Sequence, residues 1–182
     1  MPEISLNILD VAQNSVTAGA MLTEIVIGVD RAADAMEVAI SDDGRGMTQE
    51  QAIKAADPFF TTRTTRKVGL GLPFLKMAAE ITGGSFVIES AVGKGTSTRA
   101  AFGLAHIDRM PIGDIAATMT TLIGSNPDID FLLRYRVDDN EFTLDTREIR
   151  TILEGIPLSE PDVLAYIAGY INEHIDDIGE RF

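Results

Sequence analysis

The chain has 182 residues, enough for one substantial domain with at most a small additional unit. Its 45% hydrophobic and 24% charged residues are the proportions of an ordinary globular protein. The absence of cysteine excludes disulfide bonds, thiolate catalysis and zinc–cysteine sites. A formal net charge of −13 argues against binding to nucleic acid or to an anionic membrane through a basic surface.

No apolar run is long enough to span a membrane, and no leader with a charged start and an apolar core opens the chain. We therefore expect a cytoplasmic protein with no membrane association. A negative overall charge does not exclude a nucleotide ligand, because only the local pocket has to be favourable.

The first predicted element is a helix over about residues 4–18, which Gly19 ends. Asp10, Asn14 and Thr17 share its polar face because they are spaced i, i+4 and i+7. A carboxylate and an amide oxygen one turn apart can serve one hard cation or its waters. The same pair also fits an ordinary solvated helix face.

Two alternating segments, residues 23–30 and 36–41, predict a β-hairpin that leads into an Asp-Gly-rich turn. In that turn Asp42 is followed by Gly44 and Gly46, which puts a carboxylate at the rim of a sheet. The glycines let the backbone turn and come close to a ligand. Taken alone, the motif fits a plain turn equally well.

Residues 48–56 predict a short helix with Thr48 as its N-cap. The next stretch, residues 57–72, is rich in hydroxyl groups, cations and glycine, and it leads into a helix over residues 72–82. A cationic, glycine-rich loop at a helix N-terminus can bind phosphate groups. The alternative is a mobile surface loop with hinge glycines. The spacing Gly69-x-Gly71 matches neither the Rossmann fingerprint nor the P-loop.

Residues 85–90 and 96–104 predict two further strands joined by a glycine-containing turn. The order of helix, two strands, loop, helix and two strands predicts an α/β (α+β) two-layer sandwich. Its mixed, mostly antiparallel sheet is expected to be covered on one face by helices.

Four motifs in the first part of the chain occur in a fixed order. They are Leu9-Asp10-Val11-Ala12-Gln13-Asn14-Ser15, then Asp42-x-Gly44-x-Gly46, then Pro58-Phe59-Phe60-Thr61-Thr62 with Gly69-Leu70-Gly71-Leu72, and lastly Gly93-Lys94-Gly95-Thr96. Together they resemble the ATP-binding domain of the GHKL superfamily, which includes DNA gyrase B, the large heat-shock chaperones, sensor histidine kinases and MutL. The closest resemblance is to the histidine-kinase-like ATPase domain, here expected to stand alone without a phosphoacceptor domain, in a Bergerat-type fold.

The resemblance implies ATP and Mg²⁺ as ligands and gives each matched position a role. Asn14 is implied as the magnesium ligand, Asp42 as the acceptor for the adenine amino group, and Asp10 as the catalytic base. The resemblance also assigns the following positions to cofactor binding: Gly44, Gly46, Met47, Phe60, Lys67, Gly69, Leu70, Gly71, Leu72 and Thr96.

Two positions depart from the family pattern. Asp10 stands where the hydrolytic members have glutamate, and the shorter side chain leaves hydrolysis in question, although a base that acts through a water remains open. Thr17 stands where histidine kinases usually have a lysine. The first motif is closer to MutL, whereas residues 58–72 are closer to the kinases.

The family pattern covers residues 1–105, and residues 106–182 predict a separate C-terminal extension. Its segments are a helix at 113–123, a hairpin at 129–137 and 141–144, a helix at 146–153 and a helix at 159–178 with Ser159 as N-cap. The apolar faces of this unit either pack on the preceding domain or form a surface for a protein partner. A homodimer is also possible.

A sensor kinase needs a phosphoacceptor histidine on a helical hairpin ahead of its ATPase domain. His106 has an arginine and a proline at suitable offsets, but it lacks the acidic neighbour and directly follows a strand. We interpret it as part of a strand-exit turn and not as a phosphorylation site.

Two functions from different classes fit these observations. The first is a protein kinase of the anti-sigma type that phosphorylates a partner in trans, with Asp10 as base. The second is a non-catalytic switch, in which ATP orders residues 58–69 and the chain then engages a partner. A degenerate domain that no longer binds nucleotide is the third possibility, and the intact motifs speak against it.

Overall fold

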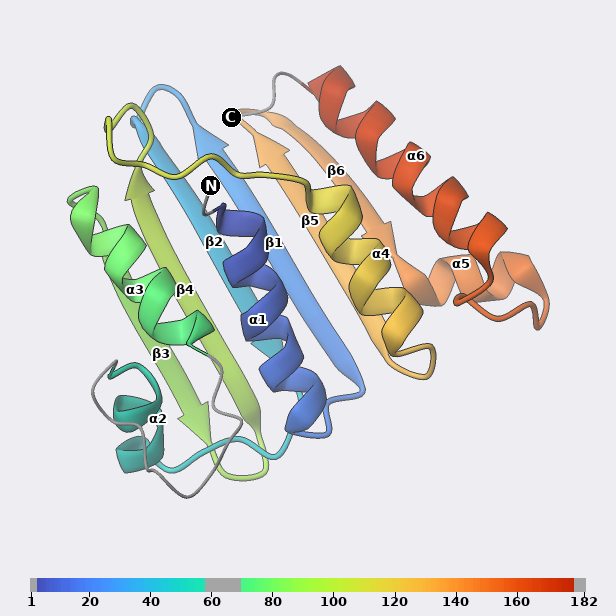
Figure 1. The fold of residues 1–182 in the computed structure, drawn as a ribbon, viewed down its shortest axis with the longest axis horizontal. Coiled ribbons are helices and arrows are strands. Elements are labelled where there is room, and N and C mark those ends of the chain that lie inside the picture. Colours follow the sequence, from blue (N-terminus) through green and yellow to red (C-terminus); the bar gives the residue numbers. More distant parts are fainter. Residues whose placement is uncertain (1–2, 58–69, 179–182) are drawn as a thin grey trace.

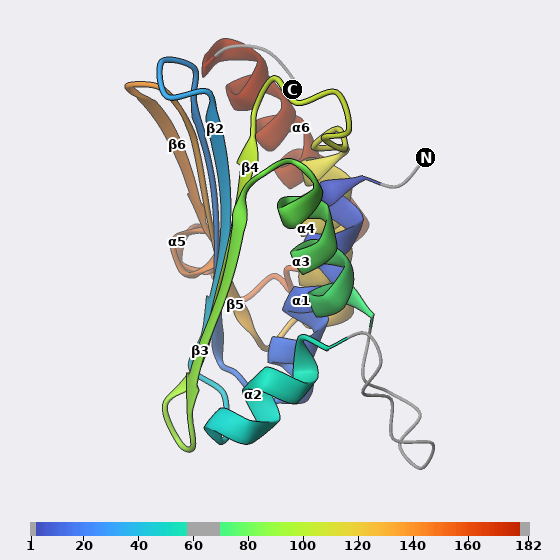
Figure 2. The same cartoon turned by 90° about the vertical axis from the view of Figure 1, so that its left-hand side faces the viewer.

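The computed structural model describes residues 3–57 and 70–178, which form a six-stranded sheet under a layer of helices (Figures 1 and 2). In chain order the elements are α1 (Ile4–Thr17), β1 (Leu22–Asp30), β2 (Ala35–Asp42), α2 (Gln49–Ala55), α3 (Gly71–Ile81), β3 (Ser85–Ala91), β4 (Gly95–Gly103), α4 (Ile115–Ser125), β5 (Asp130–Val137), β6 (Asn140–Asp145), α5 (Thr146–Leu153) and α6 (Pro161–Ile178). Within the described ranges, no helix combines the length and the apolar character that a membrane span requires.

The strands lie in the order β3-β4-β2-β1-β5-β6. All neighbours are antiparallel except β1 and β5, which run parallel with Ile25 opposite Leu133. The prediction of a mixed, mostly antiparallel sheet in a two-layer sandwich is therefore confirmed. The single parallel pair arises because the chain crosses the helix layer as α4 between β4 and β5.

The helix layer contains α3, α1, α4 and α6 side by side on the same face of the sheet (Figures 1 and 2). Each presents an apolar stripe to the strands. In α1 the stripe includes Ile4, Ile8 and Ala12, which are spaced at four residues and fully buried. The strands supply the other half of the core through alternating inward residues such as Ile25 and Ile27 of β1.

The last third of the chain continues the same sheet and the same core. β5 pairs along the full length of β1, and α4 packs between α1 and α6. Leu133 and Tyr135 of β5 are fully buried within one apolar cluster that also contains Ile4 and Ile25. Of the two alternatives for the apolar faces of this unit, packing on the preceding domain is the one observed for these residues.

The predicted helix N-caps have different outcomes. Thr48 caps α2 as expected, and Gln51 completes a capping box with it. The expected N-cap at Ser159 is wrong by one position. The carbonyl oxygen of Glu160 accepts the first helical hydrogen bond, from the Leu164 N–H, and Pro161 is the first helical residue. This is the position where the fixed φ of proline is favourable.

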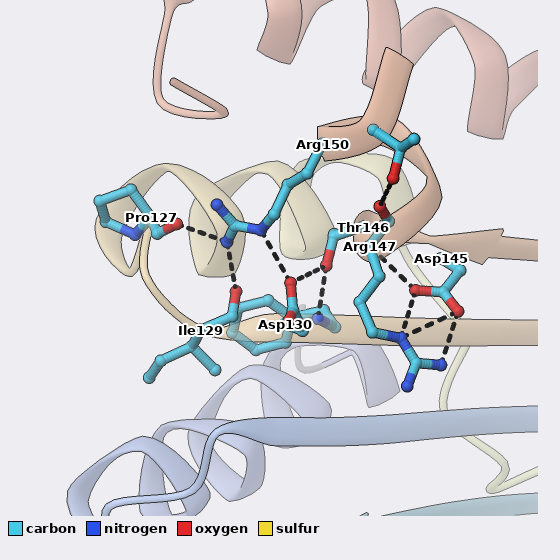
Figure 3. Close-up of polar contacts among 9 residues, drawn as sticks. Pro127, Ile129, Asp130, Asp145, Thr146, Arg147 and Arg150 are labelled. Carbon is cyan, nitrogen blue, oxygen red and sulfur yellow. Dashed lines mark hydrogen bonds and ion pairs between the residues drawn. The ribbon is translucent and has the colours of Figure 1, made fainter. Parts of the chain in front are cut away.

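An arginine-centred cluster fixes the start of β5 to α5 (Figure 3). Arg150 Nε donates to Asp130 Oδ1 over 2.8 Å, and the same guanidinium donates to the carbonyl oxygens of Pro127 and Ile129. The Thr146 hydroxyl also donates to Asp130 Oδ1. Charge-assisted bonds of this kind hold the short helix in place without burying its apolar residues.

We expect Leu133→Ala to lower the free energy of unfolding by about 2–5 kcal/mol, because Leu133 is fully buried. Since β5 pairs along β1, the loss should destabilise the whole sheet. Urea denaturation measures the free energy, and hydrogen exchange locates the effect. Ile107→Ala is the matched control, because Ile107 is 94% exposed. Lower exchange protection confined to residues 106–178, with β1 and β2 unchanged, would contradict the single-sheet interpretation.

Candidate functional site

A cavity of about 450 Å³ opens where α1, α2 and the start of α3 meet the ends of β2 and β4. Its lining includes six of the residues predicted from the sequence: Asn14, Asp42, Gly46, Met47, Leu72 and Thr96. They come from positions up to 82 residues apart in the chain, between Asn14 and Thr96. The fold thus brings the first, second and last motifs and the end of the third motif to one place.

Asp42 is the last residue of β2, and both of its carboxylate oxygens accept a hydrogen bond. Oδ1 accepts from the Gly44 N–H over 2.9 Å, and Oδ2 accepts from the Ser15 hydroxyl over 2.8 Å. Ser15 is almost fully buried on α1. These two bonds fix the rotation of the carboxylate and leave its remaining lone pairs for a ligand that donates a hydrogen bond.

Two glycines allow the turn after Asp42 to lie directly on the β3–β4 turn. Gly46 has φ +65°, and a Cβ on it would come within 2.0 Å of the Ala91 carbonyl oxygen. Gly95 has φ +87°, and its Cβ would come within 1.8 Å of the Asp42 carbonyl oxygen. Neither contact can accommodate a side chain, so these glycines are needed for close backbone packing around the cavity.

Thr96 lies opposite Asp42 in the β2–β4 ladder, and its hydroxyl contacts Ser90 Oγ at 2.9 Å. Ser90 Oγ donates to the Gly95 carbonyl oxygen and accepts from the Met47 N–H over 2.8 Å. Because the single Ser90 proton goes to Gly95, Thr96 is the donor to Ser90. The hydroxyl that bonds Asp42 therefore comes from Ser15, and Thr96 helps to hold the backbone on which Met47 sits.

The predicted catalytic and magnesium residues lie one turn apart on α1. Asn14 is half-buried in the cavity wall, whereas Asp10 is exposed and does not line the cavity. Asp10 lies against Gly71, the first residue of α3: a Cβ on Gly71 would come within 2.6 Å of Asp10 Cβ. The missing side chain at Gly71 is what allows α3 to begin so close to α1.

The remaining predicted residues have varied positions. Gly44 lies behind Asp42, where a Cβ would meet Ala18 and the Asp42 carboxylate at 2.9 Å. Leu70 directly precedes α3 and is exposed. Phe60, Lys67 and Gly69 lie outside the described residues.

Sequence reasoning overlooked two cations of the cavity wall, Arg45 and Lys54. Lys54 lines the cavity from α2, where it donates a hydrogen bond to Glu50 one turn earlier. That hydrogen bond, with the charge of Lys54, holds the pKa of Glu50 below its ordinary value. The available signal was the one-turn spacing of Gln51 and Lys54 on α2, which places both on the same helix face.

This architecture and the motif positions around the cavity define the class of protein as an α/β sandwich of the GHKL type. A family model described as "Histidine kinase-, DNA gyrase B-, and HSP90-like ATPase" matches residues 3–106, and the chain belongs to this family. The membership implies ATP binding and relates the chain to the histidine kinases.

Curated relatives agree with this assignment. Sporulation kinase E of Bacillus subtilis (strain 168) is 30% identical over 96 residues, which are 53% of this chain and 13% of that protein. Sensor histidine kinase ZraS of Klebsiella oxytoca is 35% identical over 89 residues, which are 48% of this chain and 19% of that protein. The match thus spans less than a fifth of either relative.

Among solved structures, the N-terminal domain of a DNA repair protein superposes with a TM-score of 0.53 at 14% identity. The superposition covers 80% of this chain and 53% of that one. At this identity the likeness concerns the fold alone.

We expect Gly46→Ala to destabilise the protein much more than Gly93→Ala. Both glycines have positive φ, at +65° and +77°, so each alanine introduces a backbone strain of about 1–2 kcal/mol. Only at Gly46 would the new Cβ also meet a backbone carbonyl, which adds about 1–3 kcal/mol, whereas nothing lies within 4 Å at Gly93. Thermal unfolding of both variants measures the difference. Equal destabilisation would refute the proposed close packing of the two turns.

Proposed function

We propose that the chain binds Mg–ATP in this cavity and transfers the γ-phosphoryl group to a protein partner in trans. The observation that supports this most directly is the orientation of Asp42 at the cavity wall by Ser15 and Gly44. A carboxylate held in this way accepts a hydrogen bond from the N6 amino group of adenine. Guanine presents a carbonyl oxygen at the same position, which the carboxylate repels.

The remaining walls suit a nucleotide. A volume of about 450 Å³ lies within the usual range for small-molecule sites, roughly 300–1,000 Å³. Val11, Ile40 and Leu72 offer apolar surface for the base, and Arg45 and Lys54 offer positive charge for the phosphates. Local cations are needed because the chain as a whole carries a charge of −13.

Asn14 is the residue that would hold magnesium. Its amide oxygen is the type of ligand that this ion accepts, and magnesium commonly keeps several waters and takes other ligands from substrate phosphates. No group of three or more acidic, histidine or cysteine side chains gathers into a metal site within residues 3–57 and 70–178. A single amide supplemented by phosphate and water is compatible with that arrangement. When bound, the ion would neutralise phosphate charge.

In the transfer step, the hydroxyl or imidazole of the partner forms a bond to the γ-phosphorus while the bond to the bridging oxygen of ADP breaks. Asp10 is the proposed acceptor of the proton released by the attacking group. Asp10 is exposed on α1, beside the first residue of α3, and is therefore accessible to a partner side chain.

The same position of Asp10 supports a second candidate function. Asp10 does not line the cavity, so bound ATP would have no contact with it in this arrangement. The second candidate is a non-catalytic switch, in which ATP binding alone alters how the chain engages its partner.

We expect calorimetric titration to show micromolar binding of Mg–ATP, no binding of GTP, and loss of most of the ATP affinity in Asp42→Asn. The amide presents an N–H₂ group in place of one acceptor and loses the charge. Asp43→Asn is the matched control, because it removes the same charge one residue away. Asp43 Oδ1 accepts from the Met21 and Leu22 N–H groups, which an amide oxygen can also do.

Equal loss of affinity in the two variants would show that Asp42 does not act as a specific adenine acceptor. An absence of ATP binding to the native chain at millimolar nucleotide would refute both candidate functions and leave a scaffold that has the fold without its ligand.

Asp10→Asn distinguishes the two candidate functions. For the kinase, we expect turnover to fall by about 10²–10⁴-fold while ATP affinity stays nearly unchanged. For the switch, neither ATP binding nor partner engagement should change. ADP formation in a single-turnover assay measures the turnover, and calorimetry of the same variant measures the ATP affinity.

A further inference from the structure

A second cavity, of about 460 Å³, lies at the β6 edge of the sheet, beside α5 and α6. Leu144 of β6, which is nearly fully buried, contributes to its lining. Ile149 and Ile152 line it from α5, and Val163 and Tyr166 line it from α6. We call this cavity the α5–α6 groove. Figure 1 shows α5 and α6 beyond the last strand of the sheet, away from α1 and α2, which line the first cavity.

The apolar residues of α5 are incompletely covered. Ile149, Ile152 and Leu153 lie at positions that share one side of the helix, but Thr146 is the only fully buried residue of α5. Ile152 is 79% exposed, and Tyr166 on the facing helix is 66% exposed. An apolar stripe left open on a structured helix indicates a surface that another molecule covers.

The charges around the groove identify the kind of molecule. Residues 141–178 contain nine acidic residues and only two basic ones, Arg147 and Arg150. Figure 3 shows both arginines already paired with carboxylates, Arg147 with Asp145 of the groove lining and Arg150 with Asp130. Glu148 and Asp162 in the groove lining are exposed acidic side chains. The groove therefore favours a cationic occupant.

Tyr166 adds a second preference for a cation. Its ring is stacked on that of Tyr170, with 6.1 Å between ring centroids, and both residues line the groove. An aromatic face beside carboxylates binds guanidinium or ammonium groups, and arginine is the more common partner. A second copy of this chain, an anionic membrane and nucleic acid would all bring negative charge to an acidic rim.

We propose that the α5–α6 groove docks an amphipathic segment of a partner protein that carries lysine or arginine beside its apolar residues. The apolar side chains cover Ile149, Ile152 and Val163. The cationic side chains lie against Glu148, Asp162 and the ring of Tyr166. This is the usual way in which an amphipathic helix fills a hydrophobic groove. The interaction is independent of the nucleotide cavity.

The probe is a fluorescein-labelled amphipathic peptide of leucine and lysine, with a leucine–glutamate peptide of the same pattern as comparison. Fluorescence anisotropy with the full chain measures binding. We expect Ile152→Ser to weaken binding of the lysine peptide by about tenfold, as loss of an interface anchor does. Because Ile152 is exposed, the unfolding transition should not move, and the ATP affinity should stay the same.

Charge reversal provides the matched comparison. Glu148→Lys with Asp162→Lys should weaken binding of the lysine peptide by at least about tenfold. Glu80→Lys with Glu89→Lys makes the same change in net charge at exposed positions on α3 and β3, and it should alter binding by less than about twofold. The leucine–glutamate peptide should bind much more weakly than the lysine peptide.

Three results would overturn the proposal. The first is equal weakening by the two charge-reversal pairs, which would indicate only general attraction to an acidic protein. The second is a dimer in sedimentation analysis that Ile152→Ser dissociates, which would make the occupant a second copy. The third is Ile152-dependent binding to vesicles of anionic lipid, which would make it a membrane.

Discussion

β1 is the element on which both halves of the molecule depend. It pairs antiparallel with β2 on one side and parallel with β5 on the other, so that the proposed nucleotide cavity and the C-terminal hairpin are built on a common central strand. Its inward residues, Ile25 and Ile27, are buried in the core under the helix layer. A central strand of this kind cannot slip by one residue, because that would turn its apolar side chains toward solvent on the open face. The positions of Asp42 at the end of β2 and of the α5–α6 groove beyond β6 are therefore set by one register.

The face of the sheet opposite the helix layer is exposed to solvent, and its side chains do not oppose this strand register. Arg134 of β5 pairs with Glu24 of β1, and Arg99 of β4 pairs with Glu37 of β2. Each pair joins neighbouring strands across the ladder. Exposed pairs contribute little to stability, about 0–1 kcal/mol each, but charged side chains of opposite sign favour one alignment of the strands over others.

Local sequence patterns were sufficient to predict the helices and strands, whereas contacts between residues far apart in the chain could not be predicted. The periodicity of apolar residues predicted α1, the β1–β2 hairpin and α4, because burial on one face is a local property of the sequence. The placement of Ser15 on Asp42 and of Ser90 on Met47 joins residues 27 and 43 positions apart, and no local pattern encodes either bond. The parallel pairing of β1 with β5 could not be predicted from the sequence for the same reason. The motif order identified Asp42 and Asn14 as a pair, but the position of Asp10 outside the cavity depends on how α3 crosses α1.

That crossing has a mechanical consequence. Because Gly71 has no side chain, the first turn of α3 rests directly on α1 at Asp10, with no flexible groups between the two backbones. Two helices in contact at a glycine can rotate about the point of contact, but α3 cannot move closer to α1 without a collision. The contact therefore allows α3 to rotate on α1 but not to move closer to it. Any tilt of α3 changes the surroundings of Asp10 directly, and Asn14 lies only one turn further along the same helix.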